Sequence, residues 1–192
     1  FFKSQMTSDI FVRHYTEVAD ASRIPVLLYN VTMYTGVTLQ ADAVEALSRH
    51  PNIVGMKESG NDLILISDCV ARTPDNWTVL AGSATTLFHA LCAGCDGAIL
   101  ALASLVPAAC VELVALVQAN RVAEARALHR KLLPLARSIG GGHGIPGLKV
   151  ALDLAGYRGG YPRPPLRTVA PTVVDTIRGQ LDALGVVPAQ AS

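Results

Sequence analysis

Apolar residues follow two alternating patterns along the first part of this chain. Short apolar runs predict strands at residues 24–29, 53–57, 78–82 and 97–102. The first run does not alternate polar with apolar residues, which indicates a strand that is buried on both faces. Apolar residues at helical spacing predict intervening helices at residues 40–49, 63–72 and 85–93, and an earlier helix that ends near Ser22. Strands separated by helices are typical of βαβ units with right-handed crossovers, so the pattern predicts a parallel sheet.

The strand pattern stops after Leu102, and helices follow. They are predicted at residues 107–118, 122–138, 146–155 and 172–184. Four strand–helix units with a helical tail amount to about half of an eight-stranded α/β barrel, which typically needs about 250 residues. The alternative is a small open doubly wound sheet, although no glycine-rich nucleotide fingerprint follows any predicted strand.

One apolar stretch, Ala98 to Val117, is long enough to raise the question of a membrane span. Pro107 and Glu112 lie inside it. A strand, a turn and a helix with the proline near its start explain the same residues. We therefore expect two buried elements there, with a transmembrane helix as the less favoured alternative.

Charge and cysteine content narrow the class of partner and compartment. The chain has 192 residues, with 16 basic and 15 acidic side chains and a net charge of +1. This balance gives no electrostatic footprint for nucleic acid or an anionic membrane, so we expect a small-molecule partner. No secretory leader pattern opens the sequence, which favours a reducing compartment, the cytoplasm or, in a eukaryote, the mitochondrion.

The four cysteines are predicted to lie in helices, at Cys69, Cys92, Cys95 and Cys110. Cys92 and Cys95 follow His89 at a spacing that some metal sites use. A structural zinc site would need a second ligand pair, and a redox motif would need a preceding strand, and neither is found in the sequence. Small buried side chains are the favoured interpretation, and no metal ligand is assigned.

Two predicted strands end in residues with reactive side chains. Lys57 ends one predicted strand, and Tyr29 ends the strand before it. In α/β barrels the carboxyl ends of the strands carry the reacting groups. Burial would lower the pKa of such a lysine toward the working pH and make its amine a nucleophile toward carbonyl carbon, while a phenol can shuttle protons. The plainer alternatives are a lysine that reaches solvent and pairs with Glu58, and a tyrosine whose hydroxyl merely finds a partner.

Four segments resemble one enzyme family in order and spacing. They are PVLLYNVTMYTGVTL (residues 25–39), HPNIVGMKESG (50–60), VLAGSA (79–84) and GAIL (97–100). Together they resemble the pyruvate-dependent Schiff-base lyases, a family that includes dihydrodipicolinate synthase, N-acetylneuraminate lyase and 4-hydroxy-2-oxoglutarate aldolase. The resemblance covers essentially the whole chain.

The resemblance implies a fold and a domain organisation. It implies the C-terminal half of a (β/α)8 TIM barrel, strands five to eight, over residues 1–118, followed by a helical C-terminal extension over residues 119–192. Phe2 aligns just after the fourth strand of the family, so the loop that binds the keto-acid carboxylate lies outside this chain. The chain is expected to be a fragment that is inactive alone. Full-length relatives are often dimers of dimers, so a homo-oligomer, a dimer or tetramer, is expected.

The resemblance also implies roles for individual residues. Lys57 matches the Schiff-base lysine, and Tyr29 matches the catalytic tyrosine. Gly82 and Ile99 match substrate-binding positions beside the bound keto acid; without the resemblance they are a turn glycine and a core strand residue. Ser59 matches a serine seen in the hydroxyoxoglutarate aldolases, and it is expected to help hold the distal part of the substrate. No metal or organic cofactor is implied.

The family pattern is not followed everywhere. Thr32 and Tyr34 stand where synthase-type members carry proline and arginine, and GIPGLK (144–149) and GYRGG (156–160) look closer to the 4-hydroxy-2-oxoglutarate aldolases. The expected reaction is cleavage of 4-hydroxy-2-oxoglutarate to pyruvate and glyoxylate. The alternative is dihydrodipicolinate synthase, which condenses pyruvate with aspartate semialdehyde. A truncated inactive or keto-acid-binding protein is the alternative from another class.

Overall fold

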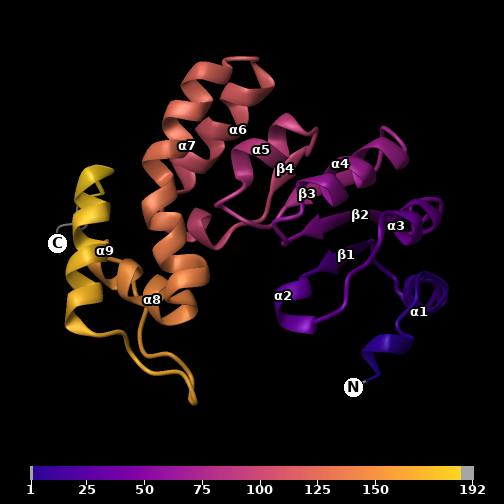
Figure 1. Cartoon of the computed structure of the whole chain (residues 1–192), viewed down its shortest axis with the longest axis horizontal. Helices are drawn as coiled ribbons and strands as arrows, with labels where there is room; N and C mark the ends of the chain where they lie inside the picture. The colour runs from indigo at the N-terminus through magenta and orange to yellow at the C-terminus, as the bar shows by residue number, and fades with distance from the viewer. Residues whose placement is uncertain (1, 187–192) are drawn as a thin grey trace. The chain divides into compact units, whose positions relative to one another are not determined.

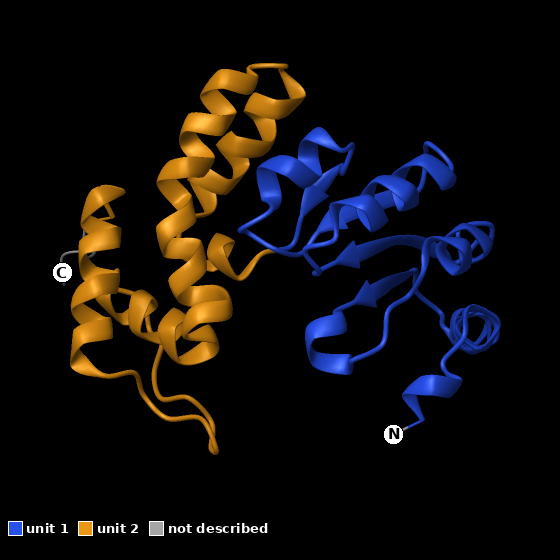
Figure 2. Ribbon diagram, in the orientation of Figure 1, with its two compact units in different colours: residues 1–99 blue, residues 100–192 orange. Residues whose placement is uncertain are grey.

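The computed structural model describes residues 2–186, which form two compact units. The first unit comprises residues 1–99 and the second residues 100–192 (Figure 2). The first unit holds the sheet and the second is helical. The predicted boundary at residue 118 separates a half barrel from its helical extension, which is a different division from that between the two compact units. It stays a prediction.

The first unit is built on a four-stranded parallel sheet (Figure 1). Its strands lie in the order of the sequence, β1 (Val26–Asn30), β2 (Ile53–Glu58), β3 (Thr78–Ala81) and β4 (Gly97–Ala98). A helix precedes each strand: α1 (Ser8–Ala21), α3 (Ala41–Leu47), α4 (Leu63–Arg72) and α5 (Leu87–Cys92). The predicted parallel α/β architecture is confirmed. The short elements η1 (Lys3–Gln5) and α2 (Thr32–Thr35) were not predicted.

The two faces of the sheet differ in burial. The helices contact one another in sequence, α1 with α3, α3 with α4 and α4 with α5, and strand residues such as Leu28 and Met56 are fully buried. On the other face, Leu27, Tyr29 and Ile99 are 45%, 50% and 45% exposed. The prediction that the first strand is buried on both faces is therefore wrong for this face, because an apolar run does not show which element would cover it.

The last strand is shorter than its apolar run suggested. β4 ends at Ala98, and a 3-10 helix, η2 (Ala101–Ser104), occupies much of the rest of the predicted strand. The physical reason is that β3 ends at Ala81, which pairs with Ala98, so a longer β4 would have no ladder partner on that side. The apolar residues beyond it, such as Leu102, are buried without being in a strand.

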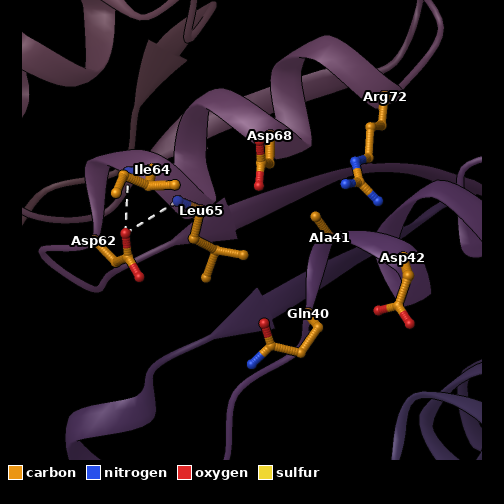
Figure 3. A pocket seen from close by; sticks show the side chains of 8 residues that line it. All are labelled: Gln40, Ala41, Asp42, Asp62, Ile64, Leu65, Asp68 and Arg72. Carbon is orange, nitrogen blue, oxygen red and sulfur yellow. Dashed lines mark hydrogen bonds between the residues drawn. The ribbon is translucent and has the colours of Figure 1, made fainter.

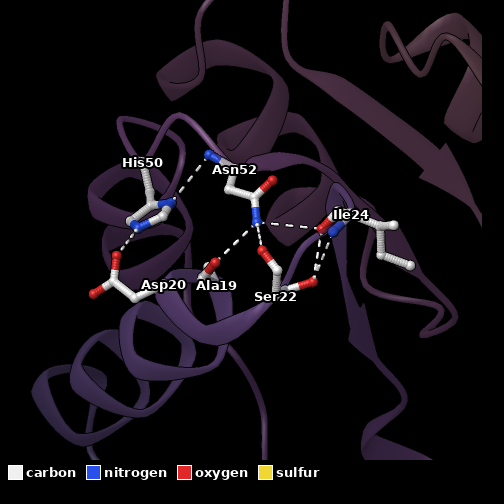
Figure 4. Close-up of polar contacts among 6 residues, drawn as sticks. All are labelled: Ala19, Asp20, Ser22, Ile24, His50 and Asn52. Carbon is white, nitrogen blue, oxygen red and sulfur yellow. Dashed lines mark hydrogen bonds and ion pairs between the residues drawn. The ribbon is translucent and has the colours of Figure 1, made fainter.

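A polar cluster joins the beginning of β2 to the α1–β1 connection (Figure 4). The Asn52 side-chain amide donates to three backbone carbonyls, those of Ala19 at 2.8 Å, Ser22 at 3.0 Å and Ile24 at 3.2 Å. The Asn52 backbone N–H donates to His50 Nδ1 at 3.1 Å, and His50 Nε2 lies 3.1 Å from an Asp20 carboxylate oxygen. This cluster satisfies carbonyls at the end of α1 and holds β1 and β2 at a fixed offset.

The second unit consists of helices. It contains α6 (Pro107–Gln118), α7 (Val122–Arg137), a π-helical turn η3 (Ser138–Gly142), α8 (Gly144–Leu154) and α9 (Pro171–Ala183). Buried leucines and isoleucines on facing helices form its core, among them Leu113, Leu132, Leu135 and Ile177. Within residues 2–186 no helix has both the length and the apolar character needed to cross a bilayer.

Candidate active site

The register of the sheet brings Tyr29 and Lys57 together. The two residues are direct partners in the β1–β2 ladder, at the carboxyl ends of both strands. Lys57 Nζ lies 4.5 Å from the centroid of the Tyr29 ring. The expectation that an amine and a phenol share one edge of the sheet therefore agrees with the structure.

The Lys57 amine lies on the open face of the sheet. Lys57 is partly buried, and Tyr29 is half exposed. Glu58, the next residue, is only 2% exposed and its side chain lies on the opposite, helix-covered face, as strand alternation requires. Among the residues that the structure describes, no ion pair joins Lys57 to Glu58, so the alternative of such a pair is not what the structure shows.

Gly82 leaves the space that the lysine side chain occupies. It follows β3 directly, and its N–H donates to the Glu58 carbonyl at 2.6 Å. A Cβ placed on Gly82 would lie 2.9 Å from Lys57 Cε and would collide with the Ser59 hydroxyl. Real Cβ atoms do not approach neighbours so closely, so this position requires glycine for contact reasons.

Ser59 and Ile99 complete the set of predicted residues. Ser59 Oγ is buried and has no hydrogen-bond partner among the described residues. The Ile99 N–H donates to the Ala81 carbonyl at 2.9 Å, and its side chain is 45% exposed. By strand alternation Ile99 shares the face of Lys57, so all five predicted site residues lie at one edge of the first unit.

Two buried polar residues lie next to this site, and the sequence-based predictions did not pair them with each other. Asn30 follows Tyr29 and Glu58 follows Lys57, and the two are 3% and 2% exposed. Asn30 Nδ2 donates to Glu58 Oε2 at 2.5 Å. Burial raises the pKa of the Glu58 carboxyl above its ordinary value, although the N–H of Gly60 and the Asn30 amide act in the opposite direction. The only sequence signal is a polar residue that ends each of two apolar strands.

A surface pocket lies apart from this set of residues. It has a volume of about 400 Å³ and is lined by residues at the start of α3 and along α4 (Figure 3). Its charged side chains are Asp42, Asp62, Asp68 and Arg72. Asp62 also accepts hydrogen bonds from the backbone N–H groups of Ile64 and Leu65, which explains it as the N-cap of α4.

The cysteines do not form a metal cluster in the described part of the chain. No group of three or more His, Cys, Asp or Glu side chains there could hold a metal ion. Cys95 lies in the connection between α5 and β4 instead of in a helix, and burial raises its pKa to about 11. Cys92 is exposed, so the expectation of small buried side chains is wrong for this one residue.

Comparison with known proteins identifies the family. Residues 2–184 match the dihydrodipicolinate synthetase family. The chain belongs to this family. A 4-hydroxy-tetrahydrodipicolinate synthase from Methanopyrus kandleri is 32% identical over 176 residues, which are 91% of this chain and 59% of that protein. The chain thus spans less than two thirds of this relative.

Solved structures of the family have the same fold. Dihydrodipicolinate synthase from Thermotoga maritima matches with a TM-score of 0.89 and 28% identity, over 96% of this chain and 64% of that one. A chloride-inhibited dihydrodipicolinate synthase from Acinetobacter baumannii, solved with pyruvate, matches with a TM-score of 0.88 and 28% identity, over 96% and 63%. The family resemblance stated from the sequence is confirmed. The comparisons name dihydrodipicolinate synthases and do not single out 4-hydroxy-2-oxoglutarate aldolase.

A substitution at Gly82 tests how closely the side chains of the candidate site are packed. We expect Gly82→Ala to lower the free energy of unfolding by about 1–3 kcal/mol, because the new methyl group overlaps Ser59 and the Lys57 side chain. Chemical denaturation measures the effect.

Gly97→Ala is the matched control for this variant. Gly97 lies in β4, which pairs with β3, and a Cβ there would be 3.6 Å from Leu80 Cδ2, an ordinary contact distance. The control is expected to change the free energy of unfolding by less than about 0.5 kcal/mol. Equal losses in both variants would show that the space beside Lys57 is not what Gly82 provides.

Proposed function

We propose that this chain supplies the Schiff-base residues of a pyruvate-dependent lyase, with Lys57 as the nucleophile and Tyr29 as the proton shuttle. The observation that carries the proposal is the position of Lys57 Nζ, 4.5 Å from the centre of the Tyr29 ring at the carboxyl edge of a parallel sheet. Membership of the dihydrodipicolinate synthetase family supports it.

The proposed chemistry begins at the ketone carbon of a 2-oxo acid. The Lys57 amine attacks this carbon, and loss of water gives an iminium ion. The iminium withdraws electrons, so removal of a proton from the third carbon leaves a lysine-bound enamine. The enamine attacks an aldehyde to form a carbon–carbon bond, or the reverse sequence cleaves that bond, and hydrolysis restores the free amine. The Tyr29 hydroxyl donates and accepts protons in these steps.

A complete site needs more sheet than this chain contains. We propose that the four strands are strands five to eight of an eight-stranded barrel, over residues 1–118, with residues 119–192 as the helical extension. The half-exposed side chains of Leu27, Tyr29 and Ile99 support this, because the interior of a barrel would bury them. Binding of the 2-oxo acid and assembly into homo-oligomers are proposals for the completed protein.

The identity of the acceptor aldehyde distinguishes two candidate reactions. Relatives such as the Methanopyrus kandleri protein are named 4-hydroxy-tetrahydrodipicolinate synthase, which favours aspartate semialdehyde. One observation favours the second candidate, 4-hydroxy-2-oxoglutarate cleavage. Tyr34, which is 80% exposed, stands where the family resemblance implies the arginine of synthase-type members. Comparing the two aldehydes as acceptors of the pyruvate enamine separates the candidates.

Borohydride reduction tests the proposed chemistry. The chain is joined to the N-terminal segment of the Methanopyrus kandleri relative that precedes its matched region, then treated with pyruvate and sodium borohydride. Peptide mass spectrometry is expected to find a reduced pyruvate adduct on Lys57 and none on Lys3, Lys131 or Lys149. A folded chimera with no adduct, or with the adduct on another lysine, would overturn the proposal and would favour a binding or inactive protein.

A further inference from the structure

A buried hydrogen-bond network lies behind the strand ends that carry Tyr29 and Lys57. Asn30 and Glu58 are ladder partners, one position beyond Tyr29 and Lys57, and their side chains meet on the helix-covered face. Glu58 Oε2 accepts from Asn30 Nδ2 at 2.5 Å, and Glu58 Oε1 accepts from the Gly60 N–H at 2.5 Å. Asn30 Oδ1 accepts from the Leu39 N–H at 3.1 Å.

The network holds the two loops that follow the strand ends of the candidate site, one after β1 and one after β2. The Asn30 side chain bonds to Leu39 and so spans the connection from β1 to α3, with a second, longer contact of 3.5 Å from Nδ2 to the Leu39 carbonyl. Glu58 bonds to Gly60 and so holds the turn that follows β2. The direct bond between Asn30 and Glu58 ties one loop to the other.

The donors and acceptors of the network fit only one arrangement. Both Glu58 oxygens accept from N–H groups, as a carboxylate does. The Leu39 N–H fixes the Asn30 amide with its oxygen toward Leu39 and its nitrogen toward Glu58. An amide in place of the Glu58 carboxylate would turn an NH2 group toward either Asn30 Nδ2 or the Gly60 N–H, and one bond would be lost.

Backbone bonds connect this network to the reacting side chains. The Ser59 N–H donates to the Asn30 carbonyl at 2.9 Å, and the Gly82 N–H donates to the Glu58 carbonyl at 2.6 Å. The same two residues that form the buried pair therefore hold the ends of β1, β2 and β3 together. Tyr29 and Lys57, one position earlier on the opposite face, depend on that alignment.

We infer that Asn30 and Glu58 are positioning residues, which hold the loops after β1 and β2 and thereby keep Lys57 against Tyr29. This inference rests on the proposed function for its chemical consequence but not for its structural one. It assigns the pair a role through Lys57 and Tyr29 and gives it no contact with the substrate.

A double variant that exchanges the positions of the amide and the carboxylate, Asn30→Asp with Glu58→Gln, tests the inference. Asn30→Asp alone sets two carboxylates against each other, and Glu58→Gln alone sets donor against donor. In the double variant the introduced amide donates to the introduced carboxylate and accepts from the Gly60 N–H, while the other carboxylate oxygen accepts from the Leu39 N–H. Only the 3.5 Å contact is lost.

The variants are compared in the chimera described above by two measurements. Each single variant is expected to slow the borohydride-trapped reaction of Lys57 at saturating pyruvate by about tenfold or more, with little change in the half-saturating concentration, and the double variant to return within about threefold. Amide hydrogen exchange at Leu39 and Gly60 is expected to accelerate in the single variants and to recover in the double variant. Glu45→Gln is the control, because this partly exposed carboxylate on α3 pairs with Arg49 and has no bond to the network.

The outcomes separate this inference from the proposed function. If the unmodified chimera forms no adduct, the proposed function fails, and exchange at Leu39 and Gly60 still decides the network. A double variant whose losses equal the sum of the two single losses overturns the inference. Single variants that lose stability alone, while folded molecules react with pyruvate at the normal rate, overturn the positioning role. If the single variants do not fold, a folded and reactive double variant supports the inference, and an unfolded one overturns it.

Discussion

Replacing Lys57 with methionine is expected to lower turnover by the completed protein at least about a thousandfold and to abolish the borohydride-trapped adduct. Methionine keeps a flexible, unbranched side chain beside Gly82 but has no amine to attack the ketone carbon. Losses of this size are typical when an enzyme loses its nucleophile, because the covalent route is removed altogether. Steady-state assays on the chimera with pyruvate and each aldehyde measure the effect.

Lys131→Met is the control for this change. Lys131 is an exposed lysine on α7, so its loss removes one amine of the same type without touching the sheet. Turnover is expected to stay within about twofold of the unmodified chimera. Turnover that survives in Lys57→Met, in a preparation free of unmodified protein, would contradict the assignment of Lys57 as the nucleophile.

Replacing Tyr29 with phenylalanine is expected to lower turnover by about 10²–10⁴-fold while leaving the protein folded. The ring that lies beside Lys57 Nζ is retained, and only the hydroxyl that would move protons is removed. Tyr29 is half exposed, so loss of its hydroxyl has a small effect on packing. The free energy of unfolding is accordingly expected to change by less than about 0.5 kcal/mol.

Rapid-quench kinetics distinguish a proton shuttle from a simple ring contact. In Tyr29→Phe, formation of the iminium and release of product are both expected to slow, because each step needs a proton moved. Tyr34→Phe is the matched control, since Tyr34 is 80% exposed and lies in α2, the short helix that follows the same strand. A loss in Tyr29→Phe no larger than in Tyr34→Phe would rule out the shuttle.

The contacts around Lys57 show why its neighbourhood tolerates little change. The ring of Tyr29 lies beside the amine, the missing side chain of Gly82 makes room for Cε, and the buried Asn30–Glu58 pair lies behind the strand ends. Tyr29 lies on β1, Gly82 follows β3, and the Asn30–Glu58 pair lies on the opposite face of β1 and β2. The position of the amine therefore depends on the register of three strands, which explains why substitutions on either face are expected to affect it.

The sequence by itself determined the architecture of the first unit and the two main candidate residues. Apolar runs separated by helical patterns are typical of a parallel sheet, and in such a sheet the carboxyl ends of strands share one edge. Tyr29 and Lys57 each end such a run, so their proximity followed from the chain order. The family resemblance rests on the same segments and is confirmed over residues 2–184.

Only the tertiary structure decided the contacts that depend on register and on the side of the strand. Whether Glu58 pairs with Lys57 or with Asn30 depends on which face each side chain takes, and β4 ends where its partner ends. The exposure of one face of the sheet also could not be predicted from the apolar runs, because an apolar run looks the same whichever element covers it. Local sequence encodes strands and their ends, whereas the space beside Lys57 Cε exists only once separate strands are assembled.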